Sequence, residues 1–411
     1  MRLPWQCKLQ KVLKWHTMSS LKDLFLLDPK VIFLNHGSFG AIPRPVLRAY
    51  QEWQRRYEYQ PVHFITNELM EDLKQARSTL GSYLHTSPDD LAYLTNATEA
   101  VNLVARSLKL KPGDEILTSD HEYGACDNIW EFVSQKTGAK YIHQSIPIPF
   151  TSQEQALENL WKGVSSKTKI IFISHITSPT AQEFPVEEIC RKAKEEGILT
   201  FIDGAHAPGQ INLNLDQISA DFYTGNCHKW MMAPKGAAFL YVKPELQTGL
   251  EPLIVSWGWG KDSPFETGSP FLDNMQWSGT RDHSAFLSVP AAIKFQEEYG
   301  WESVRNDCHQ LLSQALNRIS ELTGIEPVYV NGSSSYHQMG VASLPYIPDL
   351  PNFKNRLYDL YNIEIPCISW KRYQFLRISI QGYNNQEDID LLIAALKELL
   401  PLVINGKRDG W

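Results

Sequence analysis

The amino-acid sequence predicts an α/β protein: a large domain with a mainly parallel sheet between helices, and a smaller α+β domain toward the C-terminal end. Two observations predict this fold class. Strand-like and helix-like segments alternate from about residue 90 to residue 245, which is typical of βα units and a mostly parallel sheet. Long helical periodicities replace this alternation from about residue 283. We therefore expect a tail over residues 1–20, a large domain over 21–285 and a small domain over 286–411.

Short apolar runs bounded by polar turns predict the strands of the large domain. In chain order, these runs cover residues 91–94, 115–118, 170–174 and 199–202. A helix over residues 98–108 is indicated by apolar side chains at helical spacing, and a second helix covers 185–196. Ligands bind sheets of this kind at the carboxyl ends of the strands, so the residues just after these runs are candidates for a functional site.

The rest of the chain has a different pattern. Residues 258–279 are rich in Gly, Trp, Ser and Pro and show little periodicity. Long irregular segments of this type are usually functional or interfacial. The small domain is then predicted to contain helices over 284–299 and 301–323, strands over 340–344 and 375–380, and an amphipathic helix over about 387–400.

Composition argues against several classes of partner. Lys+Arg 39 against Asp+Glu 46 give a formal net charge of −7, which disfavours a general nucleic-acid or anionic-membrane surface. The longest apolar runs are too short to cross a bilayer. The basic N-terminal tail is interrupted by lysines and lacks the apolar core of a signal peptide; we expect it to be mobile or docked on the surface. We expect no nucleic-acid partner, no membrane association and a cytoplasmic location.

Cysteine and histidine usage predicts neither disulfides nor a metal site. The six cysteines form no C-x-x-C pair, and the chain is too long and too poor in cysteine for a disulfide scaffold. Reduced thiols are therefore expected. The histidines relevant to a site are single and scattered along the chain, so no metal is expected; they are His121, His175, His206 and His283.

Two polar residues near strand ends indicate a cofactor. Asp203 directly follows a buried apolar strand, and a buried carboxylate there needs a cationic partner. Lys229 lies in a turn between two strand-like segments, where a lysine can form a Schiff base with an aldehyde. Taken singly, Asp203 could be an ordinary turn residue and Lys229 a surface lysine. Together they match pyridoxal 5'-phosphate, which needs a lysine for its aldehyde and an acid for its ring nitrogen.

A candidate phosphate site supports this interpretation. Residues 95–100 lie between a predicted strand and a predicted helix. Amide groups at the helix start, together with the Thr98 hydroxyl, would bind a phosphate, although an N-cap threonine is a simpler explanation of Thr98 alone. Because all three elements occur in one chain, pyridoxal 5'-phosphate is the expected cofactor.

Six motifs carry a resemblance to a known family, and they cover residues 33–40, 95–100, 174–180, 203–207, 228–229 and 277–281. Arg377 extends the match into the last domain. The motifs around Asp203 and Lys229 are specific for the superfamily, whereas Asn-His-Gly-Ser-Phe-Gly and His-Ile-Thr-Ser-Pro are more specific for one branch. The chain resembles the class V aminotransferase group of fold-type I pyridoxal-phosphate enzymes, and within it the isopenicillin N epimerase-like branch.

The resemblance implies a role for each matching residue. Lys229 would form the Schiff base and move the Cα proton, Asp203 would bond the pyridine nitrogen, and His206 would approach the phenolic oxygen. Tyr123 would stack on the ring where many relatives have a histidine. The phosphate would be bound by Ala97, Thr98, Asn226, His228 and, from the neighbouring subunit, Thr280. The resemblance thus implies a homodimer with shared active sites.

A second set of residues would bind the amino-acid substrate. Arg377 matches the family's carboxylate-binding arginine, and a planar guanidinium suits a carboxylate. The remaining members of the expected set are Asn35, His36, Ser178 and Arg281.

The reaction type stays open at the level of sequence. An epimerase-like reaction is expected, with a C–S lyase on cysteine or a cysteine derivative such as hercynylcysteine sulfoxide as the alternative, and a class V aminotransferase as a further one. All three share the removal of a Cα proton. Cys367 is the only candidate for a desulfurase nucleophile, and we expect it, like Cys227, to be a packed thiol. A serine hydrolase is disfavoured because no G-x-S-x-G motif occurs. A non-catalytic cofactor-binding protein is disfavoured because all the catalytic elements are present.

Overall fold

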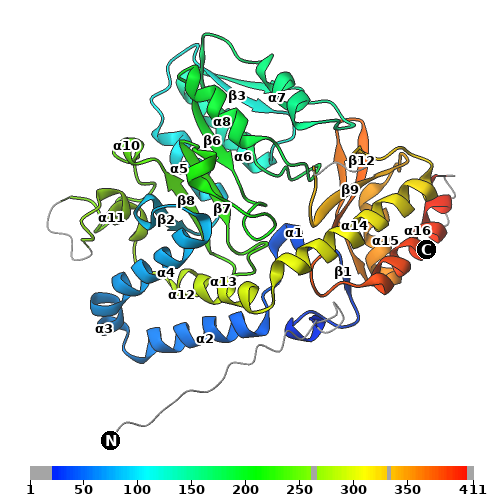
Figure 1. Cartoon of the computed structure of the whole chain (residues 1–411), viewed down its shortest axis with the longest axis horizontal. Coiled ribbons are helices and arrows are strands. Elements are labelled where there is room, and N and C mark those ends of the chain that lie inside the picture. Colours follow the sequence, from blue (N-terminus) through cyan, green and yellow to red (C-terminus); the bar gives the residue numbers. More distant parts are fainter. Residues whose placement is uncertain (1–20, 261–265, 331–334, 405–411) are drawn as a thin grey trace, which may run out of the picture.

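A computed structural model describes residues 21–260, 266–330 and 335–404 of the protein (Figure 1). The expected tail over residues 1–20 lies outside these ranges. The largest element is a seven-stranded sheet with the strand order β2-β8-β7-β6-β5-β3-β4. Its strands are β2 (Leu91–Leu94), β3 (Glu115–Ser119), β4 (Lys140–Gln144), β5 (Thr168–Ser174), β6 (Leu199–Asp203), β7 (Phe222–Asn226) and β8 (Ala238–Val242).

Helices cover both faces of this sheet. Along β5, Ile170 and Phe172 pack into one hydrophobic cluster with α5 (Ala97–Ser107) and α6 (Gly124–Thr137). The alternate residues of the strand, such as Ile171, pack into a second cluster. That second cluster includes α8 (Val186–Glu195). Burial on two faces explains why the strand sequences are almost continuously apolar.

The predicted fold class is confirmed, with one antiparallel strand in the large sheet. Strands β3 to β7 run parallel to one another. Strand β8 runs antiparallel to both β2 and β7. The reversal is local because only a short connection, which contains Lys229, joins β7 to β8.

A smaller antiparallel sheet with the order β11-β12-β9 lies in the C-terminal region, on the right in Figure 1. Its strands are β9 (Met339–Leu344), β11 (Cys367–Trp370) and β12 (Tyr373–Ser379). Helix α14 (Trp301–Thr323) packs on β9, and α16 (Gln386–Ile404) packs on α14 and α15 (Leu350–Tyr361).

The N-terminal end of the described chain lies beside this C-terminal region. Strand β1 (Ile32–Phe33) pairs in parallel with β10 (Ile363–Glu364). The segment just before the first site motif is thus joined to the region that contains Arg377. The domain boundaries expected from the sequence stay predictions.

The remaining helices complete the two layers. The α-helices are α1 (His36–Phe39), α2 (Arg44–Tyr59), α3 (Pro61–His63), α4 (Leu69–Leu84), α7 (Gln153–Trp161), α9 (Leu215–Ile218), α10 (Pro244–Gln247), α11 (Pro270–Gln276), α12 (Ser284–Leu287) and α13 (Val289–Glu298). A single π-helical segment, η3 (Phe64–Glu68), and two 3-10 turns, η2 (Lys22–Leu24) and η4 (Pro88–Asp90), also occur within the described ranges.

The single helix predicted over residues 284–299 is wrong in one respect, because the structure divides it into α12 and α13. Pro290 lies in the first turn of α13, where it lacks an amide hydrogen and favours a new helix start over continuation of the preceding one. None of the helices in the described part of the chain has the length and apolarity needed to cross a membrane.

Candidate active site

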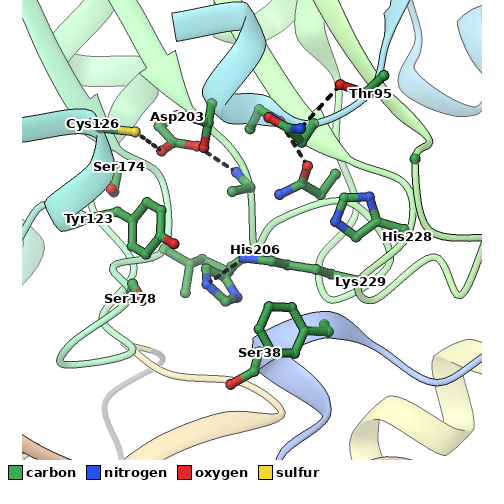
Figure 2. Close-up of a pocket in the computed structure, with 18 residues that line it drawn as sticks. Ser38, Thr95, Tyr123, Cys126, Ser174, Ser178, Asp203, His206, His228 and Lys229 are labelled. Carbon is green, nitrogen blue, oxygen red and sulfur yellow. Dashed lines mark hydrogen bonds between the residues drawn. The ribbon is translucent and has the colours of Figure 1, made fainter. Parts of the chain in front are cut away.

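A cavity of about 320 Å³ lies at the carboxyl ends of the large sheet (Figure 2). It receives the last residues of β5, β6 and β7, the start of α5 and the loop before α6. Its lining residues are Ser38, Phe39, Thr95, Asn96, Ala97, Thr98, Tyr123, Cys126, Ser174, Ile176, Ser178, Asp203, Ala205, His206, Asn226, His228, Lys229 and Gly236. This is the edge at which parallel sheets bind ligands, and the volume suits a small molecule.

Lys229 lies in this cavity with its amine 3.1 Å from Nε2 of His206. The backbone of Lys229 contacts the segment that precedes α2. Nε2 of His36 donates to the Lys229 carbonyl oxygen at 3.1 Å. Gly40 has φ +72°, and a Cβ there would come within 2.2 Å of the His228 carbonyl oxygen, so only glycine fits this approach. Burial lowers the pKa of Lys229 to about 8, which favours the neutral, nucleophilic amine.

Asp203 is the last residue of β6 and is 3% exposed. One carboxylate oxygen accepts the Ala205 amide at 2.9 Å, and the other accepts the Cys126 thiol at 3.5 Å. Burial raises the pKa of Asp203, and within the described ranges it forms no ion pair. A buried carboxylate with this environment is suited to a protonated ring nitrogen, which would provide the missing charge.

His206 lies between Lys229 and Trp230 and contacts both. The indole Nε1 of Trp230 donates to Nδ1 of His206 at 3.3 Å, and indole nitrogen is a donor only. The neutral imidazole therefore has its hydrogen on Nε2, which faces the Lys229 amine. Burial lowers the pKa of His206 well below its usual value, so the imidazole remains neutral.

The first residues of α5, Ala97 and Thr98, form another part of the cavity wall. The Ala97 amide donates to Oδ1 of Asn226 at 2.9 Å, and the Glu99 amide donates to the N-cap Asn96 at 2.9 Å. The Thr98 amide between them is a first-turn donor that these contacts do not use. Together with the Thr98 hydroxyl and the nearby His228, it forms a cradle that fits a phosphate at a helix N-terminus.

Arg377, on β12, lies behind two serines that line the cavity. Its Nη1 donates to the Ser178 carbonyl oxygen at 2.7 Å and to the Ser178 hydroxyl at 3.0 Å, and its Nη2 donates to the Ser38 hydroxyl at 3.0 Å. The side chain is 6% exposed, its Nε has no hydrogen-bond partner among the described residues, and none of their carboxylates pairs with it. A buried guanidinium without an acidic partner is suited to bind an anion, although Arg377 itself is not among the residues that line the cavity.

The other expected substrate residues lie in different positions. Asn35 does not line the cavity; it accepts a hydrogen bond from the Ser38 hydroxyl at 2.5 Å and so acts on Arg377 through that serine. His36 is fully buried beneath Lys229, and its Nδ1 accepts from the Tyr383 hydroxyl at 2.9 Å. This position does not support a direct substrate contact for His36. Arg281 packs its guanidinium 5.0 Å from the ring centre of Phe286, away from the cavity.

Tyr123 and Thr280 differ in their relation to the cavity. Tyr123 precedes α6, lines the cavity and is 49% exposed, so its ring is available to a ligand. Thr280 is exposed and does not line this cavity. Its expected contact with the phosphate of a neighbouring subunit stays a prediction.

The cysteines divide into one that contacts the site and others that do not. Sequence reasoning missed Cys126, although it lies three residues after Tyr123, one turn along α6 and on the same side. Cys227 is fully buried, and burial raises its pKa. Cys367 lies on β11 outside the cavity, and burial raises its pKa to about 12. Over residues 21–260, 266–330 and 335–404, no cluster of three or more His, Cys, Asp or Glu side chains could hold a metal.

Known proteins resemble this chain over most of its length. The family model Aminotransferase class-V matches residues 32–392. The chain is 35% identical over 391 residues to isopenicillin N epimerase of Amycolatopsis lactamdurans, which covers 93% of this chain and 98% of the relative. It is 27% identical over 421 residues to a probable chloroplastic L-cysteine desulfhydrase of Arabidopsis thaliana, which covers 93% of this chain and 84% of the relative.

Solved structures share the fold. The apo cysteine desulfurase of Thermococcus onnurineus NA1 has a TM-score of 0.79 at 20% identity, covering 93% of this chain and 97% of the other. A C-DES mutant with glycine covalently linked to its PLP-cofactor has a TM-score of 0.77 at 19% identity, covering 90% and 97%. From the family match and the identity to its relatives, this chain belongs to the class V aminotransferase family of pyridoxal-phosphate-dependent enzymes.

Proposed function

We propose that three parts of the cavity hold pyridoxal 5'-phosphate. Lys229 would bind its aldehyde carbon, because the amine lies in the cavity with a pKa lowered by burial. Asp203 would keep the ring nitrogen protonated, and Thr98, Asn226 and His228 would bind the phosphate. When bound, the cofactor supplies a ring that withdraws electrons from Cα of an amino acid.

Arg377 would bind the α-carboxylate of that amino acid. Ser38 and Ser178 hold its two terminal nitrogens, so the fork has a fixed orientation before substrate arrives. This preorganisation lowers the entropic cost of binding. Since every amino acid has an α-carboxylate, Arg377 would select the class of substrate and leave its side chain to other residues.

The reaction that we propose is epimerisation at Cα, of the kind named for the relative in Amycolatopsis lactamdurans. An epimerase must remove a proton from one face of Cα and return one to the other. The observation that supports this reaction is that two proton carriers, the Lys229 amine and the Tyr123 hydroxyl, line the same cavity. Lys229 would act on one face and Tyr123 on the other. His36 is fully buried and does not line the cavity, so it is unsuited to act as the second acid.

A C–S lyase is the second candidate, and a specific observation favours it over persulfide-forming desulfuration. Lysis requires only the removal of the Cα proton by Lys229 and the departure of a sulfur group from Cβ. A desulfurase also needs a thiolate near the substrate. Cys367 lies on a strand outside the cavity and its pKa is raised by burial, so it is unsuited to that role. Cys126 does line the cavity, but its thiol donates to Asp203 and burial raises its pKa well above the ordinary value, so it too is unsuited to act as a thiolate.

One experiment separates the reactions. The holoenzyme is incubated in heavy water with isopenicillin N, cysteine and S-substituted cysteines, and products are followed by NMR and chiral chromatography. Epimerisation predicts deuterium at Cα in both configurations. Pyruvate, ammonia and a released thiol would instead establish lysis, and a keto acid with aminated cofactor would establish transamination.

A conservative variant tests the role of Tyr123 within that experiment. Tyr123→Phe keeps the aromatic ring and removes the hydroxyl, so it should lower the rate of interconversion by about 100-fold or more while deuterium still enters with retained configuration. Tyr346→Phe is the control, because Tyr346 is exposed and outside the cavity. Interconversion by Tyr123→Phe at the rate of the unaltered enzyme would remove the structural support for an epimerase.

We also propose that the enzyme is a homodimer in which Thr280 reaches the phosphate site of the partner. An exposed apolar surface supports this proposal. It consists of side chains that are each at least 40% exposed: Leu253, Ile254, Val255, Trp257 and Trp259. Apolar surface of this type is usually covered in an interface.

A further inference from the structure

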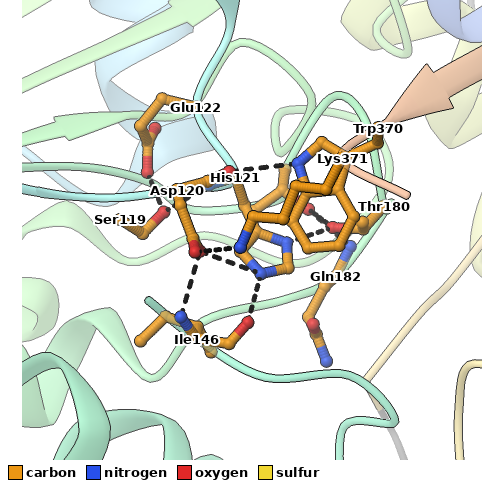
Figure 3. Close-up of polar contacts among 10 residues, drawn as sticks. Ser119, Asp120, His121, Glu122, Ile146, Thr180, Gln182, Trp370 and Lys371 are labelled. Carbon is orange, nitrogen blue, oxygen red and sulfur yellow. Dashed lines mark hydrogen bonds and ion pairs between the residues drawn. The ribbon is translucent and has the colours of Figure 1, made fainter. Parts of the chain in front are cut away.

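The turn between β11 and β12 contacts the loop that precedes Tyr123 (Figure 3). Trp370 pairs with Tyr373 across the two strands, so Lys371 and Arg372 form a two-residue turn. The Lys371 amine forms an ion pair with the Asp120 carboxylate. The Trp370 indole donates to the Asp120 carbonyl oxygen at 3.0 Å. Lys371 and Asp120 are 251 positions apart along the chain, so this contact depends on the tertiary fold.

The loop is fixed on its other side by His121 and Asp120. His121 is fully buried; its Nε2 donates to the Ile146 carbonyl oxygen at 2.8 Å, and its Nδ1 accepts from Thr180 at 2.8 Å. Its ring centre lies 4.4 Å from that of Trp370. Asp120 accepts the Ile146 amide through Oδ1 at 3.0 Å, which leaves Oδ2 for Lys371. The loop is therefore held between the segments that follow β4 and β5 on one side and the turn on the other.

Lys371 has a backbone conformation that is unusual for a residue with a long side chain. Lys371 has φ +52°, a conformation for which Gly or Asn is the usual choice in a two-residue turn. A non-glycine residue keeps such a conformation where its surroundings hold it. Besides the ion pair, its amine lies 4.5 Å from the centre of the Trp370 ring.

The position of this turn along β12 connects it to the active site. Arg377 lies six residues after Lys371 on the same hairpin, and Tyr123 lies three residues after Asp120. We propose that Lys371 and Trp370 are positioning residues, which fix the distance between Arg377 and Tyr123 and so set the space for the substrate. This inference rests on the proposed function for the roles of Arg377 and Tyr123. The contact of Lys371 and Trp370 with Asp120 does not depend on those roles.

Three substitutions separate charge from turn geometry. Lys371→Asn removes the charge and keeps a residue that tolerates the left-handed conformation, and Lys371→Arg keeps the charge. Asp120→Asn retains an oxygen for the Ile146 amide and loses only the carboxylate. Arg372→Asn is the matched control, since Arg372 is an exposed cation in the same turn that contacts Tyr373.

Two measurements on the holoenzyme follow. The first is hydrogen exchange by mass spectrometry, which measures how fast the backbone amides exchange in the peptide that contains residues 119–124. The second is a titration with glycine, in which the cofactor's visible absorption measures the affinity for an α-carboxylate. We expect Lys371→Asn and Asp120→Asn each to speed amide exchange in that peptide. Each should also weaken glycine binding by about tenfold. The double variant should be no worse than either single one, and Lys371→Arg and Arg372→Asn should match the unaltered enzyme.

Two results would overturn the inference: equal behaviour of Lys371→Asn and Arg372→Asn in both measurements, or fully additive effects of Asp120→Asn and Lys371→Asn. Failure of the proposed function is distinguishable from either, because it would leave the unaltered protein without a glycine-dependent change in absorption. The exchange measurement would then still report whether the turn holds the loop.

Discussion

Replacing Arg377 with methionine is expected to stabilise the cofactor-free protein and to abolish the binding of an α-carboxylate. Arg377 is a buried cation without an acidic partner among the described residues, held by Ser38 and Ser178. Methionine has a similar length and no charge to desolvate. If Arg377 binds a ligand at a cost in stability, its replacement should raise the stability of the cofactor-free protein and remove ligand binding.

The size of both effects can be worked out from the contacts. Burial lowers the pKa of Arg377 from 12.5 to about 10, and at about 1.4 kcal/mol for each tenfold change in proton affinity this amounts to about 3 kcal/mol. The hydrogen bonds to Ser38 and Ser178 offset about 2 kcal/mol of it. The variant should therefore be about 1 kcal/mol more stable, which raises the thermal midpoint by about 1–2 °C. Loss of the fork should weaken glycine binding by about 100-fold.

The assay combines a thermal melt of the cofactor-free protein with a glycine titration of the holoenzyme. Arg372→Met is the control, because Arg372 is an exposed cation on the same hairpin, and it should leave both measurements unchanged. If the Arg377→Met variant melts below the unaltered protein, Arg377 has a structural role. Unchanged glycine affinity in that variant would show that the α-carboxylate binds elsewhere.

Three further predictions concern the cofactor. Asp203→Asn should still capture the cofactor on Lys229 but slow Cα deuterium exchange by about 100-fold, as measured by NMR. Burial lowers the pKa of Lys229 to about 8, so its amine should be about 10% neutral at pH 7 and about 90% neutral at pH 9. Stopped-flow absorbance should therefore show a rate of cofactor capture that rises about tenfold between these pH values and then levels off. A lysine with an unshifted pKa would instead give a rise of about 100-fold without a plateau. Thr280→Ala should lower cofactor affinity in a protein that sediments as a dimer, and full activity of a monomer would contradict the shared site.

The parts of the fold that could be predicted from sequence are those with strong local signals. Strands β5 and β6 are continuous apolar runs because both faces of the sheet are buried. Strand β4 was missed because it lies at the sheet edge, where its residues are only partly buried and no apolar run forms. The long helices α2 and α4, over Arg44–Tyr59 and Leu69–Leu84, were not predicted either, although the apolar positions of α4 have helical spacing.

The site residues likewise divide into those with a local sequence signal and those that depend on tertiary packing. Asp203, Lys229 and Thr98 could be found because each follows a strand or begins a helix, and the topology brings such ends together. The contacts of Cys126 with Asp203 and of Trp230 with His206 depend on packing between segments far apart in the chain. His36 was expected to touch substrate, but its place beneath Lys229 depends on how the segment after β1 packs. No local pattern carries that information.

The most direct test of the proposed site is to identify the residue that binds the cofactor covalently. The purified protein is incubated with pyridoxal 5'-phosphate, reduced with borohydride, digested and sequenced by mass spectrometry. Lys235 is an internal comparison, because it lies six residues away, its amine donates to the Gly40 carbonyl oxygen at 2.9 Å, and desolvation lowers its pKa too. We expect a single modified residue, Lys229, and no modification in Lys229→Ala. Modification of Lys235 instead, or a protein that takes up no cofactor, would contradict the assignment of the active site.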